Sequence, residues 1–307
     1  MISYKKLFLM MEEKEISKEK LKRETKISSA TISKLSKNEE VSMATIQILC
    51  NYFDCQPGAI LSFEKEVDEH SILYKLREEQ SVKLKGGLYH QTQIRLAYNS
   101  NHMEGSRLTE EQTRSIYETQ TIGVTEGQEK IDDIIETVNH FRCFDYILKV
   151  ADEELSEDMI KHIHLLLKNN TTDSQKEWFA VGDYKKRPNV IGDMIETTHP
   201  SKVASEMKHL LKVYREDDNI TFEDIIDFHY KFEKIHPFQD GNGRVGRLIM
   251  FKECLKYNII PFIIEDVVKD YYRRGLKEYI TEKGFLLDTC RASQDSYKKL
   301  LEYFEYI

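Results

Sequence analysis

The sequence has little proline, a single tryptophan and no long apolar run: of its 307 residues, 5 are proline and 1 is tryptophan. A transmembrane helix needs about 20 consecutive apolar residues, and no window of the chain approaches that length. The stretch MISYKKLFLMMEEKE at the N-terminus has a short apolar run that acidic residues follow, and no small-residue cleavage site. These absences predict a cytoplasmic protein without a membrane partner.

Cysteine is also scarce. The cysteines form no CxxC pair and stand in apolar patterns such as ILCNYF and FKECL (Cys50, Cys55, Cys143, Cys254 and Cys290). An odd number of cysteines in such surroundings predicts buried thiols, and supports neither a disulfide framework nor a zinc site.

What is present is typical of a helical globular chain, with 40% hydrophobic and 32% charged residues. The net charge of -8 is unevenly spread. Residues 1–63 hold ten basic and eight acidic residues, a net of +2, so the rest of the chain carries -10. The acidic larger part argues against nucleic-acid binding there, which leaves the N-terminal part as the candidate.

Residues 1–63 contain several short helix signals separated by polar breaks. Ser17, Ser28 or Ser29, and Ser42 stand where N-caps are expected, because a serine oxygen accepts from the first amides of a helix. A tight turn at 26–28 between the second and third predicted helices is typical of a helix-turn-helix.

The stretch KEKLKRETKISSATISKLSKNEEVSMATIQILCNYFDCQPGAIL resembles a lambda-repressor or Cro-like domain, in which the ISSATISKL helix lies in the major groove. The resemblance implies that lysines contact phosphates and that short polar side chains contact base edges (Ser29, Thr31, Lys34 and Lys37). A small helical module for protein contacts stays open as the alternative, because the net charge of this part is low.

A glycine-rich loop is the main feature of the remaining chain. The stretch KIHPFQDGNGRVGRLIM, residues 234–250, lies between TFEDIIDFHYKFEKI and RVGRLIMFKECLKY, both of which have apolar residues at helical spacing. His229 falls within the first apolar stripe and is expected to be a core histidine. The loop opens onto a helix N-terminus, where unpaired amides and the helix dipole favour an anion such as a phosphate.

Two other nucleotide-binding motifs must be compared with the sequence of this loop. Gly241, Gly243 and Gly246 satisfy GxGxxG, and Glu265 follows about twenty residues later, as in a dinucleotide fingerprint. That fingerprint needs a β-strand before the first glycine, whereas this sequence predicts a helix there. A GxxxxGK[ST] phosphate loop is absent as well.

The loop combines groups suited to phosphorus chemistry. His236 titrates near neutral pH and can accept a proton, and Asp240 offers the hard oxygen ligand that Mg²⁺ prefers. Arg244 and Arg247 supply positive charge for phosphate oxygens. Together they predict nucleotidyl or phosphoryl transfer to a hydroxyl group.

The residues of this loop match HxFx(D/E)GNGRxxR and so resemble the motif of Fic-domain proteins (His236, Phe238, Asp240, Gly241, Asn242, Gly243, Arg244 and Arg247). The resemblance extends over about residues 85–305. It implies an all-helical bundle with a β-hairpin flap, and AMPylation, the transfer of AMP from ATP to a Ser, Thr or Tyr hydroxyl of a protein. Phosphorylation of the target, as in a kinase-like relative, stays a minor alternative.

By position, the resemblance makes His236 the general base and Phe238 an apolar anchor of the loop. It makes Asp240 the ligand of Mg²⁺ or Mn²⁺ and assigns ATP phosphates to the glycine segment and the arginines (Gly241, Asn242, Gly243, Arg244 and Arg247). Tyr272 and Tyr279, in KDYYRRGLKEYITEK, are candidates for stacking on the base, whose identity stays open.

The stretch WFAVGDYKKRPNVIGDMIETTHP, residues 178–200, predicts a hairpin because β-branched and aromatic residues flank glycine and proline. It resembles the flap that aligns a target by strand addition, with Val190, Ile191 and Gly192 at its centre.

A second stretch, AYNSNHMEGSRLT, resembles the inhibitory signature [S/T]xxxE[G/N] through Ser100, Glu104 and Gly105. Ser100 and Glu104 are four residues apart and share one face of a helix, which Gly105 is placed to end. The resemblance implies an ion pair between Glu104 and Arg247 that denies the γ-phosphate its partner. Removal of AMP with help from the same glutamate stays open.

We therefore predict an all-α protein with a helix-turn-helix domain at 1–63, a linker or connecting helix at 64–84, and an inhibited Fic domain at 85–307 whose inhibitory helix ends near 104. Its partner is a target protein or the chain itself, and DNA through the N-terminal domain; a homodimer stays open. The alternative is a DNA-binding transcriptional regulator that uses the Fic domain as a nucleotide sensor or a dimerisation module.

Overall fold

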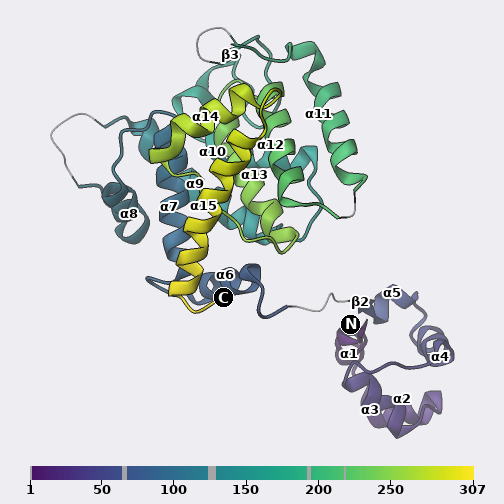
Figure 1. The fold of residues 1–307 in the computed structure, drawn as a ribbon. Helices are drawn as coiled ribbons and strands as arrows, with labels where there is room; N and C mark the ends of the chain where they lie inside the picture. Colours follow the sequence, from purple (N-terminus) through teal and green to yellow (C-terminus); the bar gives the residue numbers. More distant parts are fainter. Residues whose placement is uncertain (1, 64–67, 124–128, 192–194, 218) are drawn as a thin grey trace. The chain divides into compact units, whose positions relative to one another are not determined.

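The computed structural model describes residues 2–63, 68–123, 129–191, 195–217 and 219–307. The chain divides into two compact units, residues 1–68 and 69–307. Helices dominate both units (Figure 1), which confirms the predicted all-α class. None of the helices in the described ranges has the length and apolar character that crossing a membrane requires.

The first unit is a small helical domain closed by a two-residue strand pair. It contains β1 (Ile2–Ser3), α1 (Lys5–Glu13), α2 (Lys18–Thr25), α3 (Ser29–Ser36), α4 (Met43–Phe53), α5 (Pro57–Ile60) and β2 (Ser62–Phe63). The strands are antiparallel, with Ile2 opposite Phe63. This pair was not predicted, because two residues are too few to produce an alternating pattern.

Local sequence explains the helix boundaries of this unit. Ser17, Ser28 and Ser42 cap α2, α3 and α4, each accepting a hydrogen bond from an amide three residues later at 3.1, 3.1 and 3.3 Å. Lys26 ends α2 in the left-handed conformation, with φ of 59°. The turn between α2 and α3 is therefore the predicted one, and buried apolar residues hold the helices together (Leu7, Leu21, Ile32, Leu35, Ile46 and Leu49).

The second unit is a helical bundle with one hairpin. Its elements are α6 (Ile72–Val82), α7 (Leu88–Met103), α8 (Glu110–Thr119), α9 (Ile131–Lys149), α10 (Glu157–Lys168), η1 (Thr172–Gln175), β3 (Val190–Ile191), β4 (Ile195–Glu196), α11 (Pro200–Arg215), α12 (Phe222–Ile235), α13 (Asn242–Lys256), η2 (Asp266–Val268), α14 (Lys269–Glu278) and α15 (Gly284–Tyr303).

Helix α6 packs on α7, α9 and α13, so the helix that falls within 64–84 is part of the second compact unit. Ser71 caps it by accepting from the Tyr74 amide at 3.2 Å.

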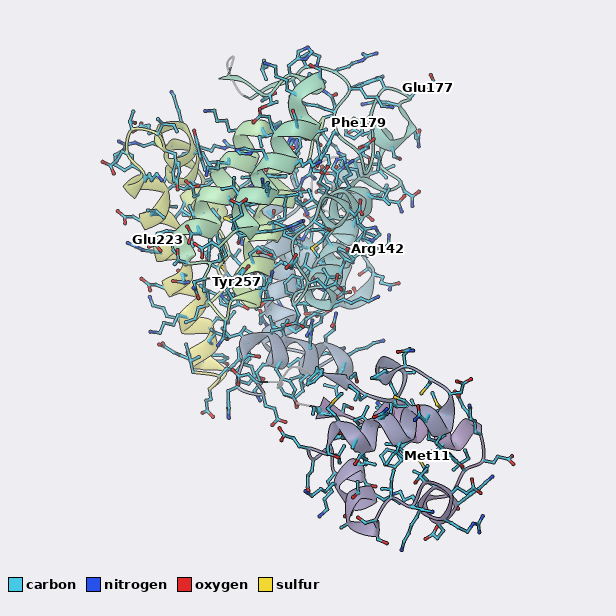
Figure 2. The ribbon with its side chains drawn as sticks, turned by 90° about the vertical axis from the view of Figure 1, so that its right-hand side faces the viewer. Met11, Arg142, Glu177, Phe179, Glu223 and Tyr257 are labelled. Atoms are coloured by element: carbon cyan, nitrogen blue, oxygen red, sulfur yellow. The ribbon has the colours of Figure 1, made fainter. Side chains whose placement is uncertain are left out.

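Helix α13 lies inside the bundle, in contact with α7, α9, α10 and α12 (Figure 1). Side chains crowd the interior of the second unit (Figure 2), and apolar residues on all sides of α13 are buried (Val245, Leu248, Ile249, Met250, Phe251 and Cys254). A helix enclosed in this way has few degrees of freedom, so the position of its first turn is fixed by the whole bundle.

The loop before α13 is short because both neighbouring helices have definite ends. Thr221 and Asp224 form a capping box that begins α12, and His236 ends it in the left-handed conformation with φ of 52°. Gly241, with φ of 82°, begins α13. No strand precedes Gly241 in this described segment, so the structure excludes the dinucleotide fingerprint there.

The predicted hairpin is present but small. Val190 lies opposite Glu196, and Ile191 lies opposite Ile195. Gly192, which we expected at its centre, lies outside the described residues. The prediction of buried thiols is confirmed for Cys50, Cys143, Cys254 and Cys290, whereas Cys55 is a partly exposed thiol.

Phe251 provides a test of the bundle core, since it is fully buried and its ring lies 5.4 Å from that of Phe144 and 5.7 Å from that of Tyr297. We expect Phe251→Ala to lower the free energy of unfolding of the second unit by about 3–5 kcal/mol. Urea unfolding followed by the fluorescence of Trp178 reports on this unit, because Trp178 is the only tryptophan of the chain.

The control is Val267→Ala, because Val267 is 79% exposed and its truncation should change the free energy by no more than about 0.5 kcal/mol. Equal midpoints for the two variants would contradict this account of the core.

Candidate active site

His236 is the histidine of the loop between α12 and α13. Its side chain is largely buried, and Nδ1 lies 3.3 Å from the backbone oxygen of Glu233. A carbonyl oxygen only accepts, so Nδ1 carries the hydrogen and Nε2 is left as the proton acceptor. Burial, followed by the charge of Lys185, lowers the pKa of His236 to about 4. The imidazole is therefore neutral at physiological pH, as a general base must be.

The loop around His236 is held by side chains rather than by regular secondary structure. Asn242 accepts from the Phe238 amide at 2.8 Å and donates to the Phe238 carbonyl at 2.9 Å. The Phe238 ring is buried and stacks on the His164 ring, with centroids 4.0 Å apart and planes 6° apart. His164 also donates to the Asp240 carbonyl at 3.1 Å, because its other nitrogen accepts from the Gly182 amide at 2.9 Å.

The first turn of α13 is an anion site with a carboxylate already beside it. A side chain at Gly243 would collide with Glu104 Oε1 and would come within 2.9 Å of Arg247 Nη1. The backbone at Gly243 is therefore bare on the side that faces Glu104. Amides at a helix N-terminus attract negative charge, and Glu104 supplies it from the residue that ends α7.

Arg247 joins the end of α7 to α13. Its Nη2 donates to Glu104 Oε1 at 2.7 Å and to the Ser100 carbonyl at 3.0 Å, and its Nε donates to the Ser100 hydroxyl at 2.9 Å. Gly105, with φ of 95°, follows and turns the chain away from the helix. The structure thus brings together Ser100, Glu104 and Arg247, which are up to 147 residues apart.

The charge of Glu104 follows from this contact. Burial alone would raise the pKa of Glu104, but the guanidinium groups of Arg247 and Arg244 outweigh burial and hold the pKa below its ordinary value. A carboxyl whose pKa is lowered by folding contributes stability above its unfolded pKa of about 4.3 and loses it as the pH falls through the folded value. At neutral pH the Glu104–Arg247 ion pair is therefore fully formed.

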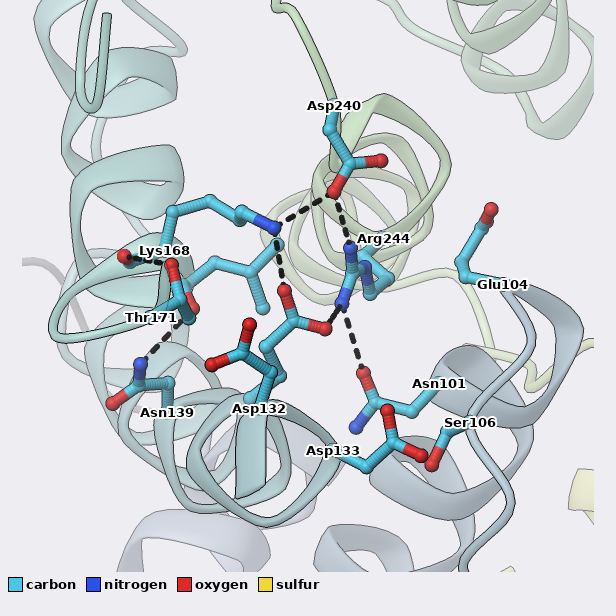
Figure 3. Close-up of polar contacts among 12 residues, drawn as sticks. Asn101, Glu104, Ser106, Asp132, Asp133, Asn139, Lys168, Thr171, Asp240 and Arg244 are labelled. Carbon is cyan, nitrogen blue, oxygen red and sulfur yellow. Dashed lines mark hydrogen bonds and ion pairs between the residues drawn. The ribbon is translucent and has the colours of Figure 1, made fainter. Parts of the chain in front are cut away.

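A second set of charges lies beneath the loop (Figure 3). Lys168, at the end of α10, is only 2% exposed, and its Nζ lies 2.5 Å from Glu136 Oε1 and 2.8 Å from both Asp173 Oδ2 and Asp240 Oδ2. Arg244 contacts Glu136 and lies 3.1 Å from Asp240 Oδ2. Burial would raise the pKa of Asp240, but Arg244 and Lys168 lower it well below its ordinary value. Arg244 is thus directed at carboxylates of the protein.

Asp240 nevertheless fits the predicted role of a metal ligand. Its side chain is 49% exposed, and one carboxylate together with phosphate oxygens is a donor set that Mg²⁺ takes. Within the described residues, no group of three or more His, Cys, Asp or Glu is arranged to hold a metal.

The hairpin is tied to the loop at its base. Lys185 Nζ donates to Asn189 Oδ1 at 2.7 Å and to Thr197 Oγ1 at 2.6 Å, while the Lys185 amide donates to the Pro237 carbonyl at 2.8 Å. Asn189 in turn donates to the Phe238 carbonyl at 3.1 Å. The exposed side chain of Val190 follows directly after this anchor.

The two tyrosines proposed for base stacking are both buried. Tyr272 shares a hydrogen bond of 2.6 Å with Nε2 of His229, which confirms His229 as a core histidine with a partner. The Tyr279 ring stacks on the partly exposed Tyr230 ring, with centroids 4.3 Å apart. In this structure neither Tyr272 nor Tyr279 opens onto solvent.

In the first unit, the four predicted DNA-contacting residues lie on or just after α3. Helix α3 buries Ile32 and Leu35 and leaves Ser29, Lys34 and Lys37 exposed, with Thr31 partly exposed. The side chains of Ser29, Lys34 and Lys37 are thus open to solvent, and that of Thr31 is partly so.

Sequence reasoning missed several residues of the site: Lys168, Glu136, His164, Lys185 and Glu233. Lys168 and Glu136 are charged residues near the apolar stripes of α10 and α9, a pattern that also fits a solvated helix border. Only the tertiary contacts show that their charges meet. His164, on the buried face of α10, gave the clearest signal, because it stands between Ile163 and the following leucines.

Together these features define a helical domain with an anion site at an enclosed helix N-terminus and a neutral histidine on the loop beside it. Residues 154–254 match the sequence model of the Fic/DOC family, and residues 6–66 match that of the Cro/C1-type HTH DNA-binding domain. The chain therefore combines a Cro/C1-type helix-turn-helix domain with a Fic/DOC-family domain.

Two known proteins of similar sequence are named as a protein adenylyltransferase or a probable one. The protein adenylyltransferase Fic of Drosophila melanogaster is 25% identical over 215 residues, which are 67% of this chain and 41% of the fly protein. A probable protein adenylyltransferase of Aquifex aeolicus is 25% identical over 215 residues, 65% of this chain and 64% of that protein. The chain thus spans about two fifths of the length of the fly relative.

Among solved structures, a Fic domain containing signaling protein from Bacteroides thetaiotaomicron superimposes with a TM-score of 0.58 at 24% identity. The match covers 75% of this chain and 90% of that one. At this identity the likeness shows the fold alone.

Lys168 provides a test of the charged network under the loop. Because its removal would leave three carboxylates without their shared cation, we expect Lys168→Met to lower the free energy of unfolding by about 3–5 kcal/mol. Urea unfolding followed by Trp178 fluorescence measures the change.

Lys176→Met is the matched control. Lys176 also contacts Asp173, at 2.6 Å, but it is 45% exposed, so we expect a loss below about 1 kcal/mol. If both variants lost the same amount, the network would have no special energetic role.

Proposed function

We propose that the second unit is a protein adenylyltransferase, which transfers AMP from ATP to a Ser, Thr or Tyr hydroxyl of a target protein or of the chain itself, and that Glu104 inhibits it. One observation carries the proposal: a neutral histidine lies on the loop that leads into an anion-binding helix N-terminus, and the protein's own carboxylate lies against that site. The adenylyltransferase names of the sequence relatives support the same reaction.

In this reaction, Nε2 of His236 accepts the proton of the target hydroxyl. The hydroxyl oxygen forms a bond to the α-phosphorus, the bond between that phosphorus and the bridging oxygen breaks, and pyrophosphate leaves with the electron pair. General base catalysis of this kind contributes about 10² to 10⁴ in rate. The amides of the segment Gly241 to Gly243 bind phosphate oxygens, and the positive charge of Arg247 stabilises the terminal phosphate.

Asp240 would hold Mg²⁺ or Mn²⁺, which when bound neutralises charge on the phosphates. Lys168 and Arg244 would act on this carboxylate, since both contact its Oδ2 and fix its orientation. Tyr272 and Tyr279 stay proposals for the base pocket, and the stacking of Tyr279 on Tyr230 adds a partly exposed ring to that region.

The hairpin would receive the target segment. An extended peptide adds to an exposed strand through backbone hydrogen bonds, which do not depend on the peptide's side chains. Strand β3, Val190–Ile191, would provide that edge. Its anchor through Lys185 and Asn189 would hold the target near His236.

Inhibition would follow from competition for Arg247. The γ-phosphate of ATP and the Glu104 carboxylate need the same guanidinium and the same end of α13. Only one of them fits, so ATP in its productive position requires that Glu104 withdraws. A withdrawn Glu104 could also orient water for removal of AMP from a modified target.

The Glu104→Gly variant tests both parts of the proposal. We expect it to incorporate radiolabelled AMP into itself or into a lysate at least about tenfold faster than the parent, as the loss of about 1.4 kcal/mol of inhibition would produce. The double variant Glu104→Gly/His236→Ala should incorporate none above background.

Glu39→Gly, an exposed change in the first unit, is the control and should match the parent. If Glu104→Gly labels nothing beyond the parent, itself included, inhibition by Glu104 is wrong. Mass spectrometry of the labelled proteins would identify the modified residue.

A second function is favoured by the first unit, which matches a DNA-binding domain and exposes one face of α3. We propose that this unit binds duplex DNA through Ser29, Thr31, Lys34 and Lys37. If the second unit binds nucleotide without turnover, the protein would be a regulator that senses nucleotide. Loss of AMP transfer in His236→Ala with DNA binding intact supports the enzyme, whereas a parent protein that never transfers AMP supports the regulator.

We expect Lys34→Ala/Lys37→Ala to weaken binding of duplex fragments selected by the parent and to reduce the slope of log affinity against log salt by about two, because each lysine neutralises one phosphate. Fluorescence anisotropy at several salt concentrations measures both. Lys5→Ala/Lys6→Ala, on α1, is the control. An unchanged slope would exclude this face of α3 as the surface that binds DNA.

A further inference from the structure

Glu233 is a buried carboxyl beside the loop with no role so far. It lies on α12, three residues before His236, and is 12% exposed. Its Oε1 has no hydrogen-bond partner among the described residues. A buried polar atom without a partner is unfavourable, so its retention needs an explanation.

Gly246 makes the space that Glu233 occupies. A Cβ at position 246 would lie 2.7 Å from Glu233 Oε1 and 2.7 Å from His229 Cε1. The absence of a side chain on α13 therefore lets the carboxyl of α12 fit beneath it. Gly246 stands at an unspecified position of HxFx(D/E)GNGRxxR, so phosphate binding does not account for this glycine.

The carboxyl faces the side of His236 that is turned away from the reaction. Glu233 Oε2 lies 3.9 Å from His236 Nδ1, the atom that already donates to the Glu233 carbonyl at 3.3 Å. Both acceptors on this side of the ring thus come from one residue. Nε2 stays on the opposite side, where a target hydroxyl would approach.

We propose that Glu233 is a positioning residue for His236: its backbone carbonyl holds the ring through Nδ1, and its carboxylate, 3.9 Å from Nδ1, balances the positive charge that the ring gains when Nε2 takes the proton of the target hydroxyl. The proposal rests on the proposed adenylyltransferase function and adds to it a residue outside the family motif. The proton moves from the hydroxyl oxygen to Nε2, and Glu233 itself gains and loses none.

Charged and titratable groups from several elements face this pair. Arg247, Glu104, His229 and Tyr272 surround Glu233. Burial raises the pKa of Glu233 to about 8, Arg247 opposes that rise and Glu104 adds to it. Glu233 therefore carries its charge above about pH 8, and removal of Glu104 brings that pH down.

The charge of Lys185 opposes protonation of His236, whereas the charges of Glu104 and Asp240 favour it. Because its pKa is near 4, His236 stays neutral throughout the range in which Glu233 titrates. A change of rate in that range therefore reports on Glu233 rather than on protonation of the base.

The first experiment compares full-length Glu104→Gly with Glu104→Gly/Glu233→Gln between about pH 6 and 9, the range that brackets the pKa of Glu233. We expect kcat/KM for AMP transfer in Glu104→Gly to rise with pH as Glu233 ionises. The Gln variant should lose that rise and fall at least about tenfold below the plateau of Glu104→Gly. A Gln variant with the rate and profile of Glu104→Gly would overturn the proposal.

Two further variants separate positioning from general damage. Gly246→Ala, also in the Glu104→Gly background, displaces the Glu233 carboxyl and should lower the plateau in the same direction. Glu223→Gln changes an exposed carboxylate on the same helix, labelled in Figure 2, and should leave rate and profile unchanged. Equal effects of Glu223→Gln and Glu233→Gln would also overturn the proposal.

The second experiment does not depend on activity. In a protein labelled with ¹³C-histidine, the ring signal of His236, assigned with His236→Asn, should shift in one step as Glu233 ionises and in another as His236 itself titrates. Glu233→Gln should abolish the first step only. If AMP transfer is absent but both steps are seen, the adenylyltransferase function fails while the contact stands; if the first step persists in Glu233→Gln, the contact itself is refuted.

Discussion

The positive end of an enclosed helix needs a negative partner, and much of the second unit follows from that need. Helix α13 begins inside the bundle, so its first amides, Arg244 and Arg247 cannot be neutralised by bulk water. Glu104 neutralises Arg247, while Glu136 and Asp240 neutralise Arg244. Each carboxylate comes from a different segment, so the helix N-terminus is also the point at which these segments are joined.

The ion pairs around the N-terminus of α13 form two layers, one beneath the loop and one above it. Beneath the loop, the buried cations Lys168 and Arg244 share the carboxylates of Glu136 and Asp240 in a network that belongs to the fold. Above it, Arg247 is paired with Glu104, whose side chain is only partly covered and lies at the end of a helix. The first layer holds Asp240 in place, and the second is the one that a ligand with negative charge could displace.

How far the sequence predicts this arrangement depends on whether a feature is local. The serine caps, the tight turn after α2 and the glycine loop between α12 and α13 each lie within a short segment, so local sequence predicted where they occur. The approach of Glu104 to Arg247, 143 residues away, came from a family resemblance and not from spacing. The burial of Lys168 and Glu233 could not be predicted from the sequence. A lysine or glutamate at a helix border is usually solvated, and only packing from other helices buries it.

Glu104 belongs to the same chain as the site it covers, so its contact with Arg247 does not weaken when the protein is diluted. A separate inhibitor dissociates when the protein is diluted, whereas a tethered group keeps the same local concentration at any protein concentration. The fraction of molecules with an open helix end is therefore an internal equilibrium constant of the fold. A ligand of the α13 N-terminus binds with an affinity reduced in proportion to this fraction. The stability of the last turn of α7 therefore sets the ligand concentration that is needed to occupy the site.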